Sequence, residues 1–333
     1  KPVRRTSPMP SRTGMKNGMR EGKMLNLYWK SNGQSRNLLP KPFKTEADFE
    51  NYVFKNQDLL GDVFILYRQI HTGNKQGIPD MLGVDQDSRI CIIEMKNVQV
   101  GEEIVPQVLG YAMWAETNPD SIKAIWLEAK SRPEDVQIDW DSLEIRIIVI
   151  APSYRANVLK MAAKINYPVD LVQIQRFSFE EEEFVLVETL EDKASGKPTI
   201  TKVMGDWTWE YYEKEHGKEP TQEFQRVVTQ LEDFVKKQGW DLPFNLNKFY
   251  TGFKLGNKVV FDVSWESTKV WAVRMKLPPE ISETFHGKAW KFQKYDATFK
   301  NSIFRPIPGS TMDISELGEM LKAAYRNVSG IQE

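Results

Sequence analysis

Two short stretches decide the fold that we expect: Gly77-Ile78-Pro79-Asp80 and Ile92-Ile93-Glu94-Met95-Lys96. Between them lies the turn sequence Asp85-Gln86-Asp87-Ser88, and apolar runs at 78–84 and 89–96 flank it. Two apolar runs joined by such a short polar turn are typical of a β-hairpin. Because paired strands lie about 4.8 Å apart, the hairpin brings Asp80 close to Glu94. Residues two apart in a strand point to the same face, so Lys96 joins them.

Asp80, Glu94 and Lys96 together are the residue types that hydrolysis of a phosphodiester requires. Two carboxylates offer hard oxygen ligands for Mg²⁺ or Mn²⁺. Such a metal polarises a phosphate and lowers the pKa of a bound water. A lysine beside it can position or deprotonate that water and stabilise charge in the transition state. We therefore expect a metal-dependent active site at these three residues.

Two helices are predicted to flank the hairpin. In the first, at 45–54, Thr45 is a suitable N-cap, and Glu46 and Glu50 share a face. A carboxylate from this helix could bind the metal directly or through water. In the second helix, at 102–116, Gln107 and Tyr111 are also four residues apart and share a face.

Further strands and helices complete an α/β fold with a mixed sheet. Apolar and β-branched runs predict strands at 63–70, 122–127, 145–150, 169–175 and 184–190, and a helix at 156–165. We expect residues 1–40 to be a basic flexible tail, 41–190 the catalytic domain and 191–206 a linker. Residues 207–333 are expected to form an α+β accessory domain, with helices at 221–237 and 315–327 around strands at 249–254, 259–264 and 269–275.

The order of these motifs resembles the PD-(D/E)XK nuclease superfamily over residues 45–190. The segment from Gln107 to Tyr111 is similar to the Q-x-x-x-Y element of RecB-like and Cas4-like members, and Arg68-Gln69 resembles the "RQ" strand of NucS/EndoMS-type nuclease domains. The resemblance implies a restriction-endonuclease-like αβββαβ core, Mg²⁺ or Mn²⁺ as cofactor and DNA as the usual substrate.

The resemblance also implies roles for individual residues. Asp80 and Glu94 would bind the metal, with the Met95 carbonyl as a further ligand, and Lys96 would be catalytic. The first helix would add a glutamate, for which we prefer Glu46 and keep Glu50 as the second choice. The remaining residues would support the site or contact the nucleic acid: Arg68, Gln69, Gln107 and Tyr111.

The segment Asn247-Lys248-Phe249-Tyr250, a turn at Gly256, and the strands and closing helix that follow resemble an uncharacterised C-terminal domain found after predicted nucleases and in GmrSD-type restriction enzymes. The lysines of this region, including Lys254, Lys258, Lys288 and Lys291, interleave with aromatic residues. This mixture fits phosphate contact with base stacking, and it fits equally well a core of aromatic residues with solvated lysines. The aromatic residues concerned are Phe253, Trp265, Trp271, Trp290, Phe292 and Tyr295.

Composition limits the classes of protein that fit. The net charge is −1, so any grip on nucleic acid must come from local patches. The single cysteine, Cys91, cannot form an internal disulfide and favours a reducing, cytoplasmic location. With three histidines besides, a structural zinc cluster is not expected. No apolar run approaches the roughly 20 residues of a membrane span, so we expect no membrane partner.

The sequence therefore predicts a Mg²⁺- or Mn²⁺-dependent DNA endonuclease that acts in restriction, defence or repair. Because cutting both strands generally needs two active sites, we expect a homodimer. Two alternatives stay open: a protein of the same fold that binds nucleic acid without cutting it, and a nuclease directed at RNA.

Overall fold

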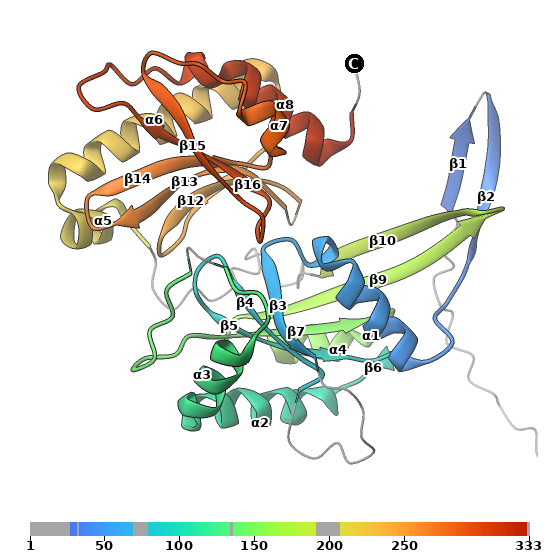
Figure 1. The fold of residues 1–333 in the computed structure, drawn as a ribbon. Helices are drawn as coiled ribbons and strands as arrows, with labels where there is room; N and C mark the ends of the chain where they lie inside the picture. The colour runs from blue at the N-terminus through green and yellow to red at the C-terminus, as the bar shows by residue number, and fades with distance from the viewer. Residues whose placement is uncertain are drawn as a thin grey trace, which may run out of the picture.

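The computed structural model describes residues 27–31, 33–68, 79–133, 136–190, 207–256 and 258–331. Two β-sheets organise these residues, one in the N-terminal part and one in the C-terminal part of the chain (Figure 1). The linker predicted at 191–206 lies outside the described residues, as do Gln69 and the loop at 72–77. No helix in the described ranges is long and apolar enough to cross a membrane.

The N-terminal sheet has eight strands in the order β1-β2-β9-β7-β5-β4-β3, with β10 paired to β9. Strands β3, β4 and β5 form the predicted antiparallel meander, whereas β5, β7 and β9 run parallel. The mixed sheet of an α/β fold is thus confirmed. The strands are β1 (Leu27–Ser31), β2 (Gln34–Pro40), β3 (Val63–Arg68), β4 (Met81–Asp85), β5 (Ile90–Met95), β7 (Ile145–Ala151), β9 (Val169–Phe179) and β10 (Glu182–Leu190). A separate ladder pairs β6 (Gln99–Val100) with β8 (Ser153–Tyr154).

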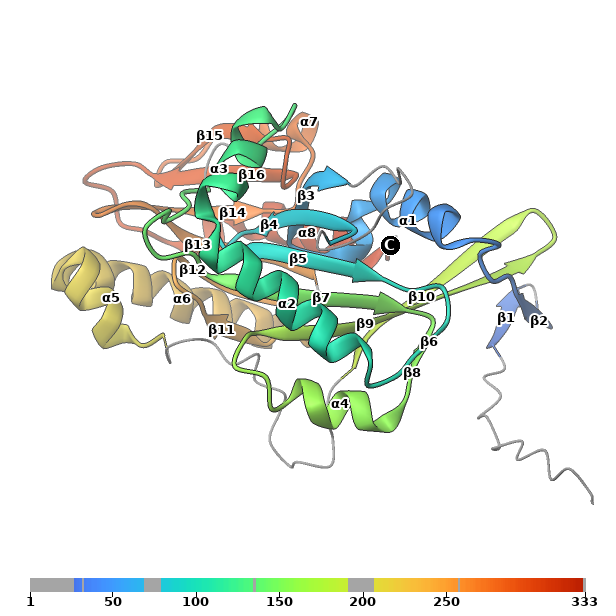
Figure 2. The same ribbon diagram turned by 90° about the horizontal axis from the view of Figure 1, so that it is seen from below.

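Strand β5 divides its side chains between two apolar cores, one on each face of the sheet. Ile90 and Ile92 belong to the core beneath α2 (Ile104–Thr117) and α4 (Ala156–Ala162). Cys91 and Ile93 belong to the core beneath α1 (Glu46–Lys55), which continues into a short 3₁₀ helix at Gln57–Leu60. Both faces of the strand are therefore buried, which explains its unbroken apolar run. Figures 1 and 2 show α1 on one side of the sheet and α2 on the other.

The strand predicted at 122–127 is wrong, because these residues lie in helix α3 (Pro119–Glu128). Pro119 begins the helix, where its missing N–H costs nothing. Ile122 is buried while Lys123 is exposed, and Ile125 packs against the same core as Ile122. Buried positions three residues apart are typical of a helix. In an apolar run as short as 122–127, the sequence pattern does not distinguish a helix from a strand.

The region predicted as a basic tail, 1–40, with one short strand at 24–29, contains two strands among its described residues. Its last part forms the hairpin of β1 and β2, and Leu39 of β2 pairs with Ser178 of β9. Trp29 packs edge-on against Phe179, which anchors the hairpin to the long β9–β10 ribbon. Residues 1–26 lie outside the described residues.

The C-terminal sheet has six antiparallel strands in the order β11-β12-β13-β14-β16-β15, and helices α6 and α8 cover one face of it (Figure 1). The predicted α+β arrangement is present, with more strands than the sequence indicated. The strands are β11 (Phe244–Leu246), β12 (Tyr250–Leu255), β13 (Lys258–Ser267), β14 (Val270–Met275), β15 (Trp290–Asp296) and β16 (Asn301–Pro306). The helices are α5 (Trp209–His216), α6 (Lys218–Gln238), α7 (Pro279–Ser282) and α8 (Gly318–Ser329), with a 3₁₀ turn at Ile314–Leu317.

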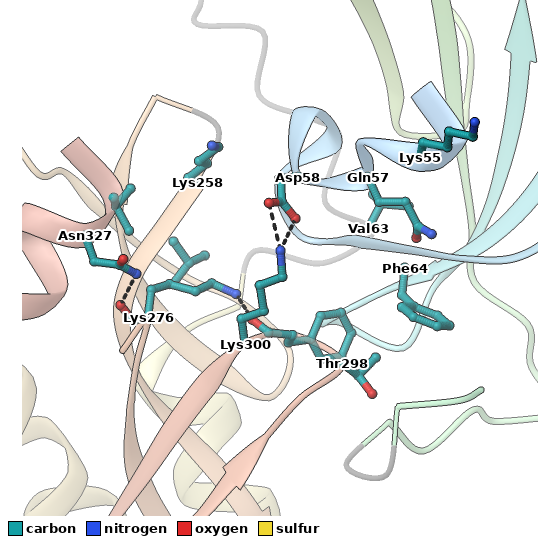
Figure 3. A pocket seen from close by; sticks show the side chains of 14 residues that line it. Lys55, Gln57, Asp58, Val63, Phe64, Lys258, Lys276, Thr298, Lys300 and Asn327 are labelled. Atoms are coloured by element: carbon teal, nitrogen blue, oxygen red, sulfur yellow. Dashed lines mark hydrogen bonds and ion pairs between the residues drawn. The ribbon is translucent and has the colours of Figure 1, made fainter. Parts of the chain in front are cut away.

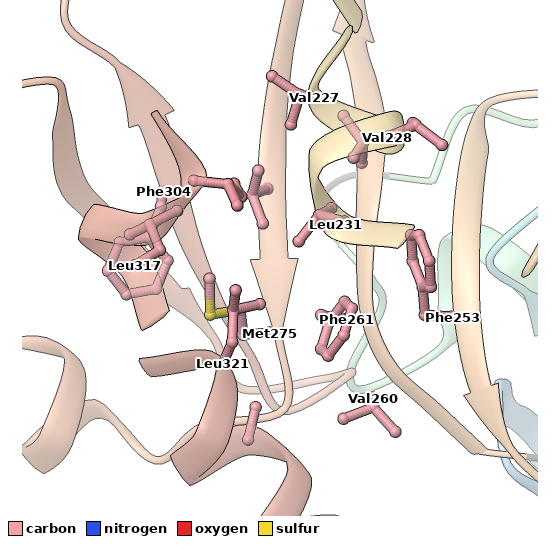
Figure 4. Packing of buried hydrophobic residues seen from close by; sticks show 14 of the residues in the cluster. Val227, Val228, Leu231, Phe253, Val260, Phe261, Met275, Phe304, Leu317 and Leu321 are labelled. Atoms are coloured by element: carbon pink, nitrogen blue, oxygen red, sulfur yellow. The ribbon is translucent and has the colours of Figure 1, made fainter. Parts of the chain in front are cut away.

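Aromatic residues of this region build its core rather than a surface for stacking bases. Phe253, Trp265, Trp271 and Trp290 are all buried in one cluster with the apolar face of α6. Figure 4 shows Phe253 packed near Leu231 of that helix. Of the two alternatives that the sequence left open, core packing therefore holds for these four residues, because their apolar surface closes the core.

The turn between β15 and β16 makes contacts between the two parts of the chain. The side chain of Phe299 in this turn is buried in a small cluster with Val84 of β4 and Val136. Beside it, Lys300 Nζ donates to both carboxylate oxygens of Asp58, at 2.7 and 2.8 Å (Figure 3). These residues border a cavity of about 480 Å³ that also receives Lys258.

Replacing Phe299 with alanine should weaken the contact between the two parts. Loss of a buried phenylalanine costs roughly 3–5 kcal/mol through lost burial and the cavity left behind. We expect a fall in the free energy of unfolding of that order, measured by urea denaturation. Val270→Ala, at a half-exposed position of the same sheet, is the matched control and should change little. Equal stability of Phe299→Ala and the parent would contradict this role.

A buried ionic network occupies the end of the β4–β5 hairpin that carries the turn. Arg146 contacts Asp62, Asp85 and Asp170 at 3.2, 3.1 and 2.7 Å. Arg89 contacts Asp85 at 2.8 Å and Asp87 at 3.0 Å. Burial raises the pKa of Asp87 from 3.8 to about 7, although Arg89 acts in the opposite direction.

This raised pKa gives Asp87 a defined effect on stability. The folded state binds the proton more tightly than the unfolded state, so Asp87 destabilises the fold progressively as the pH rises from about 4 to about 7. Asp87→Asn removes this dependence, and the difference in unfolding free energy between variant and parent should grow in favour of the variant over that range. Denaturant melts at several pH values measure it, with exposed Asp141→Asn as control. A difference that stays constant with pH would contradict the assignment.

Candidate metal centre

Asp80 lies at the start of β4, directly opposite the end of β5. Its Oδ2 accepts a hydrogen bond of 2.8 Å from the backbone N–H of Met95. Met95 lies two residues beyond Ile93, which is the partner of Met81 in the ladder of β4 and β5. This bond holds the Asp80 side chain against the edge of the sheet, next to Glu94, the last residue but one of β5. The side chains of Asp80 and Glu94 are almost fully buried, with the residues 1% and 2% exposed.

Lys96 follows Glu94 at the same edge and points back to it. Its Nζ donates to Glu94 Oε1 at 2.5 Å and to the Met95 carbonyl at 3.1 Å, and lies 3.9 Å from Glu46 Oε1. Burial acts to lower the pKa of Lys96, but Glu94, Asp80 and Glu46 outweigh it and hold the pKa above its usual value. The ammonium group is thus held by the carboxylates that surround it, and a quarter of the side chain stays open to solvent.

Helix α1 delivers two carboxylates to the same point. Thr45 caps the helix by accepting a bond from the N–H of Asp48, as predicted, and this fixes where the first turn begins. Glu46 and Glu50 lie one turn apart, and an oxygen of each lies within 4.8 Å of the other and of an Asp80 oxygen. Glu50 is fully buried, whereas a third of the Glu46 side chain is exposed. The structure thus brings together both candidates from this helix.

Helix α2 approaches from the opposite face of the sheet. Gln107 Nε2 donates to Glu94 Oε1 at 2.7 Å and to the hydroxyl of Tyr111 at 2.9 Å. These are the two residues of the Q-x-x-x-Y segment, and both lie at the site. The Gln107 amide fixes the orientation of the Glu94 carboxylate. The hydroxyl of buried Tyr111 in turn fixes the orientation of the Gln107 amide.

The donor set fits a hard divalent cation. Three carboxylate oxygens within 4.8 Å of one another repel strongly where two of the side chains are buried, and a cation relieves that repulsion. Mg²⁺ and Mn²⁺ prefer carboxylate, carbonyl and water oxygens, which Asp80, Glu46, Glu50 and the nearby Met95 carbonyl can offer. Glu94 lies at the same edge, bound to Lys96. Because Glu46 and Lys96 reach solvent, the site is not sealed in the core.

One neighbour of the site, Asn97, has a role that the sequence did not indicate. The backbone N–H of Asn97 lies 3.4 Å from Glu46 Oε2, and its side chain donates to the carbonyl of Phe43 at 2.9 Å. Asn97 therefore ties the segment after Lys96 to the segment before α1. A backbone N–H belongs to every residue type except proline, so no sequence signal marks this contact.

The residues predicted to contact nucleic acid are not part of this cluster, with one exception. Arg68 lies 3.9 Å from Glu50 Oε2 and donates to Asn51 at 3.1 Å, so its side chain faces α1. Gln69 lies outside the described residues. The four lysines belong to the C-terminal part, where Lys258, Lys288 and Lys291 are exposed and Lys254 is half-buried.

Comparisons with known proteins give a partial likeness only. No family model and no curated protein matches the chain. Among solved structures, it is similar to a repair endonuclease from Pyrococcus abyssi, with 24% identity over 39% of this chain and 47% of that chain, at a TM-score of 0.25. It is also similar to EndoMS in a complex with double-stranded DNA (20% identity, 38% and 43% covered, TM-score 0.26) and in its apo form (20%, 39% and 46%, 0.24).

This chain thus spans less than half the length of the solved structures that it matches. Its mixed α/β architecture is consistent with a restriction-endonuclease-like core followed by a β-rich C-terminal region. At such TM-scores the likeness carries no weight for activity, and the case for function depends on the acidic cluster itself.

Proposed function

We propose that this chain is a nuclease that uses Mg²⁺ or Mn²⁺ to hydrolyse phosphodiester bonds in DNA. The observation that supports it is the meeting of Asp80, Glu94, Lys96 and the α1 glutamates at one edge of the sheet. The β4–β5 hairpin, α1 and α2 each place side chains at this edge. Packing against both faces of β5 fixes the positions of the two helices.

A bound divalent cation would polarise the scissile phosphate and make a water molecule more acidic. Asp80 and the glutamates of α1 would hold the cation, with Glu94 at its side. Buried carboxylates suit this role, because the surrounding apolar atoms strengthen their attraction for the cation.

Lys96 supplies a positive charge next to the same point. Its ammonium group is anchored by Glu94 and by the Met95 carbonyl, and a quarter of its side chain is exposed to solvent. There it can orient the attacking water and stabilise the negative charge that develops on the phosphate. Gln107 keeps Glu94 in place during this step, so we assign it a positioning role.

DNA is the substrate that the resemblance to PD-(D/E)XK nucleases implies, and the geometry of the site suits an RNA strand equally well. We propose a role in restriction, defence or repair, and a homodimer that places two sites on one duplex.

Light scattering of the purified chain tests the dimer. Cleavage assays on duplex DNA, single-stranded DNA and RNA, with Mg²⁺, Mn²⁺ or EDTA, identify the substrate. Binding without cleavage under all these conditions would favour a protein that only binds nucleic acid.

Metal binding is expected to stabilise the fold. A ligand that binds only the folded state raises the melting temperature, and Mn²⁺ should do so in the parent. In Asp80→Asn and Glu50→Gln the shift should largely disappear, because each removes a carboxylate from the cluster. Glu223→Gln, on the exposed face of α6, is the control and should keep the shift. An unchanged shift in both cluster variants would place the metal elsewhere.

Lys96 is expected to act on the rate of cleavage. Lys96→Met should lower the cleavage rate by at least about 100-fold, the usual range for a group that helps a proton transfer or stabilises charge. Lys160→Met, at an exposed position of α4, changes the same functional group and should cut at the parental rate. Circular dichroism confirms that both variants fold. Parental cleavage by Lys96→Met would refute the assignment.

A further inference from the structure

A second cavity lies at the other end of the β4–β5 hairpin, where its turn meets the C-terminal sheet. Its volume is about 290 Å³, close to the lower end of the range for small-molecule sites. Both parts of the chain contribute to its wall. The lining residues used below are Gln86, Tyr211, His216, Phe249, Trp265 and Arg274.

The side chain of Gln86 is the first sign that this cavity receives a ligand. The residue is 5% exposed, and neither its Oε1 nor its Nε2 has a hydrogen-bond partner among the described residues. A buried amide without partners costs about 1–3 kcal/mol, and most native proteins avoid it. Turning this side chain toward a ligand with a donor and an acceptor side by side would satisfy both atoms.

Trp265 forms a second part of the wall. Its Nε1–H is buried and also has no acceptor within the described ranges. His216 stacks on the indole at 3.8 Å and Phe224 at 4.7 Å between ring centres. His216 is itself held by the carbonyl of Thr268 at 3.0 Å. This part of the wall is thus rigid.

The remaining walls favour a neutral, flat ligand over an anion. Tyr211 and Phe249 are half-buried aromatic residues that offer apolar surface. The only arginine in the wall, Arg274, is paired with Asp262 at 2.8 Å, and Glu215 and Glu266 add negative charge. Burial lowers the pKa of His216, which keeps its ring neutral. A phosphate would therefore find little attraction in this cavity.

We propose that this cavity binds a nucleobase. Bases are flat and carry hydrogen-bond donors and acceptors on adjacent atoms of one edge, and a glutamine amide is complementary to that edge. Aromatic walls suit the faces of such a ring. The base could come from a free nucleoside or from an unpaired position of a nucleic-acid strand, since both present the same edge.

The cavity is separate from the metal centre. Strand β5 spans six residues, or about 20 Å, between the hairpin turn and the acidic cluster. A base bound beside Gln86 therefore does not touch Asp80 or Glu94, and binding can be measured in EDTA, where no cleavage takes place. The outcome is thus independent of whether the proposed nuclease activity is correct.

Binding of adenosine and of a short single-stranded DNA is to be measured in EDTA by calorimetry, with ribose as the probe that lacks a base. We expect one or both base-containing probes to bind the parent, and Gln86→Leu to weaken that binding at least 10-fold. Binding of adenosine identifies a free nucleoside as a sufficient source, whereas binding of the oligonucleotide alone identifies a base within a strand. Gln225→Leu, at an exposed position of α6, is the matched control and should bind normally.

The melting temperature of Gln86→Leu separates a ligand-binding role from a structural one. If Gln86 had a purely structural role, its replacement would lower the melting temperature. Because the amide has no partner, leucine should leave the melting temperature unchanged or raise it. A variant that fails to fold, or that binds as tightly as the parent, would overturn the proposal. Failure of the parent to bind either probe would overturn it too.

Discussion

One hydrogen bond, from the backbone N–H of Met95 to the carboxylate of Asp80, connects the fold to the chemistry of this protein. It lies just beyond the ladder of β4 and β5, and it fixes a carboxylate at the edge of the sheet where β4 begins and β5 ends. The apolar residues that precede it on β5 are buried on both faces, so the strand cannot shift along its neighbour without exposing them. The position of Glu94 and Lys96 follows from that register.

The cost of this arrangement is electrostatic. Asp80, Glu94 and Glu50 are carboxylates with almost no exposed surface, and like charges at short range repel more strongly there than in water. Lys96 offsets part of the repulsion, and Gln107 orients one of the carboxylates. Such a set of groups is poorly explained by stability alone, and a divalent cation both balances the charge and matches the oxygen ligands.

Sequence patterns predicted the parts of the site that depend on regular geometry. The β-hairpin placed Asp80 against Glu94, and the spacing of four residues placed Gln107 beside Tyr111. The sequence favoured Glu46 over Glu50, but the structure brings both to Asp80, because both lie on the same face of α1 and the approach of the helix decides their distance from Asp80. The helix at Ile122 was missed, since a short apolar run fits either period. In the C-terminal part, Trp265 and Trp290 could equally have been surface or core residues, and only tertiary packing separates the two.

The two parts of the chain meet through Phe299, through the pair of Lys300 with Asp58 and around the proposed base cavity. The hairpin of β4 and β5 thus bears the acidic cluster at one end and the contact with the C-terminal sheet at the other. A crystal grown with Mn²⁺ would test the central claim most directly, through the anomalous signal of the metal. We expect a peak bound by Asp80 and at least one glutamate of α1, close to Glu94 and Lys96. A saturated crystal with no peak there, or with Mn²⁺ bound only elsewhere, would contradict the assignment of this edge of the sheet as a metal centre.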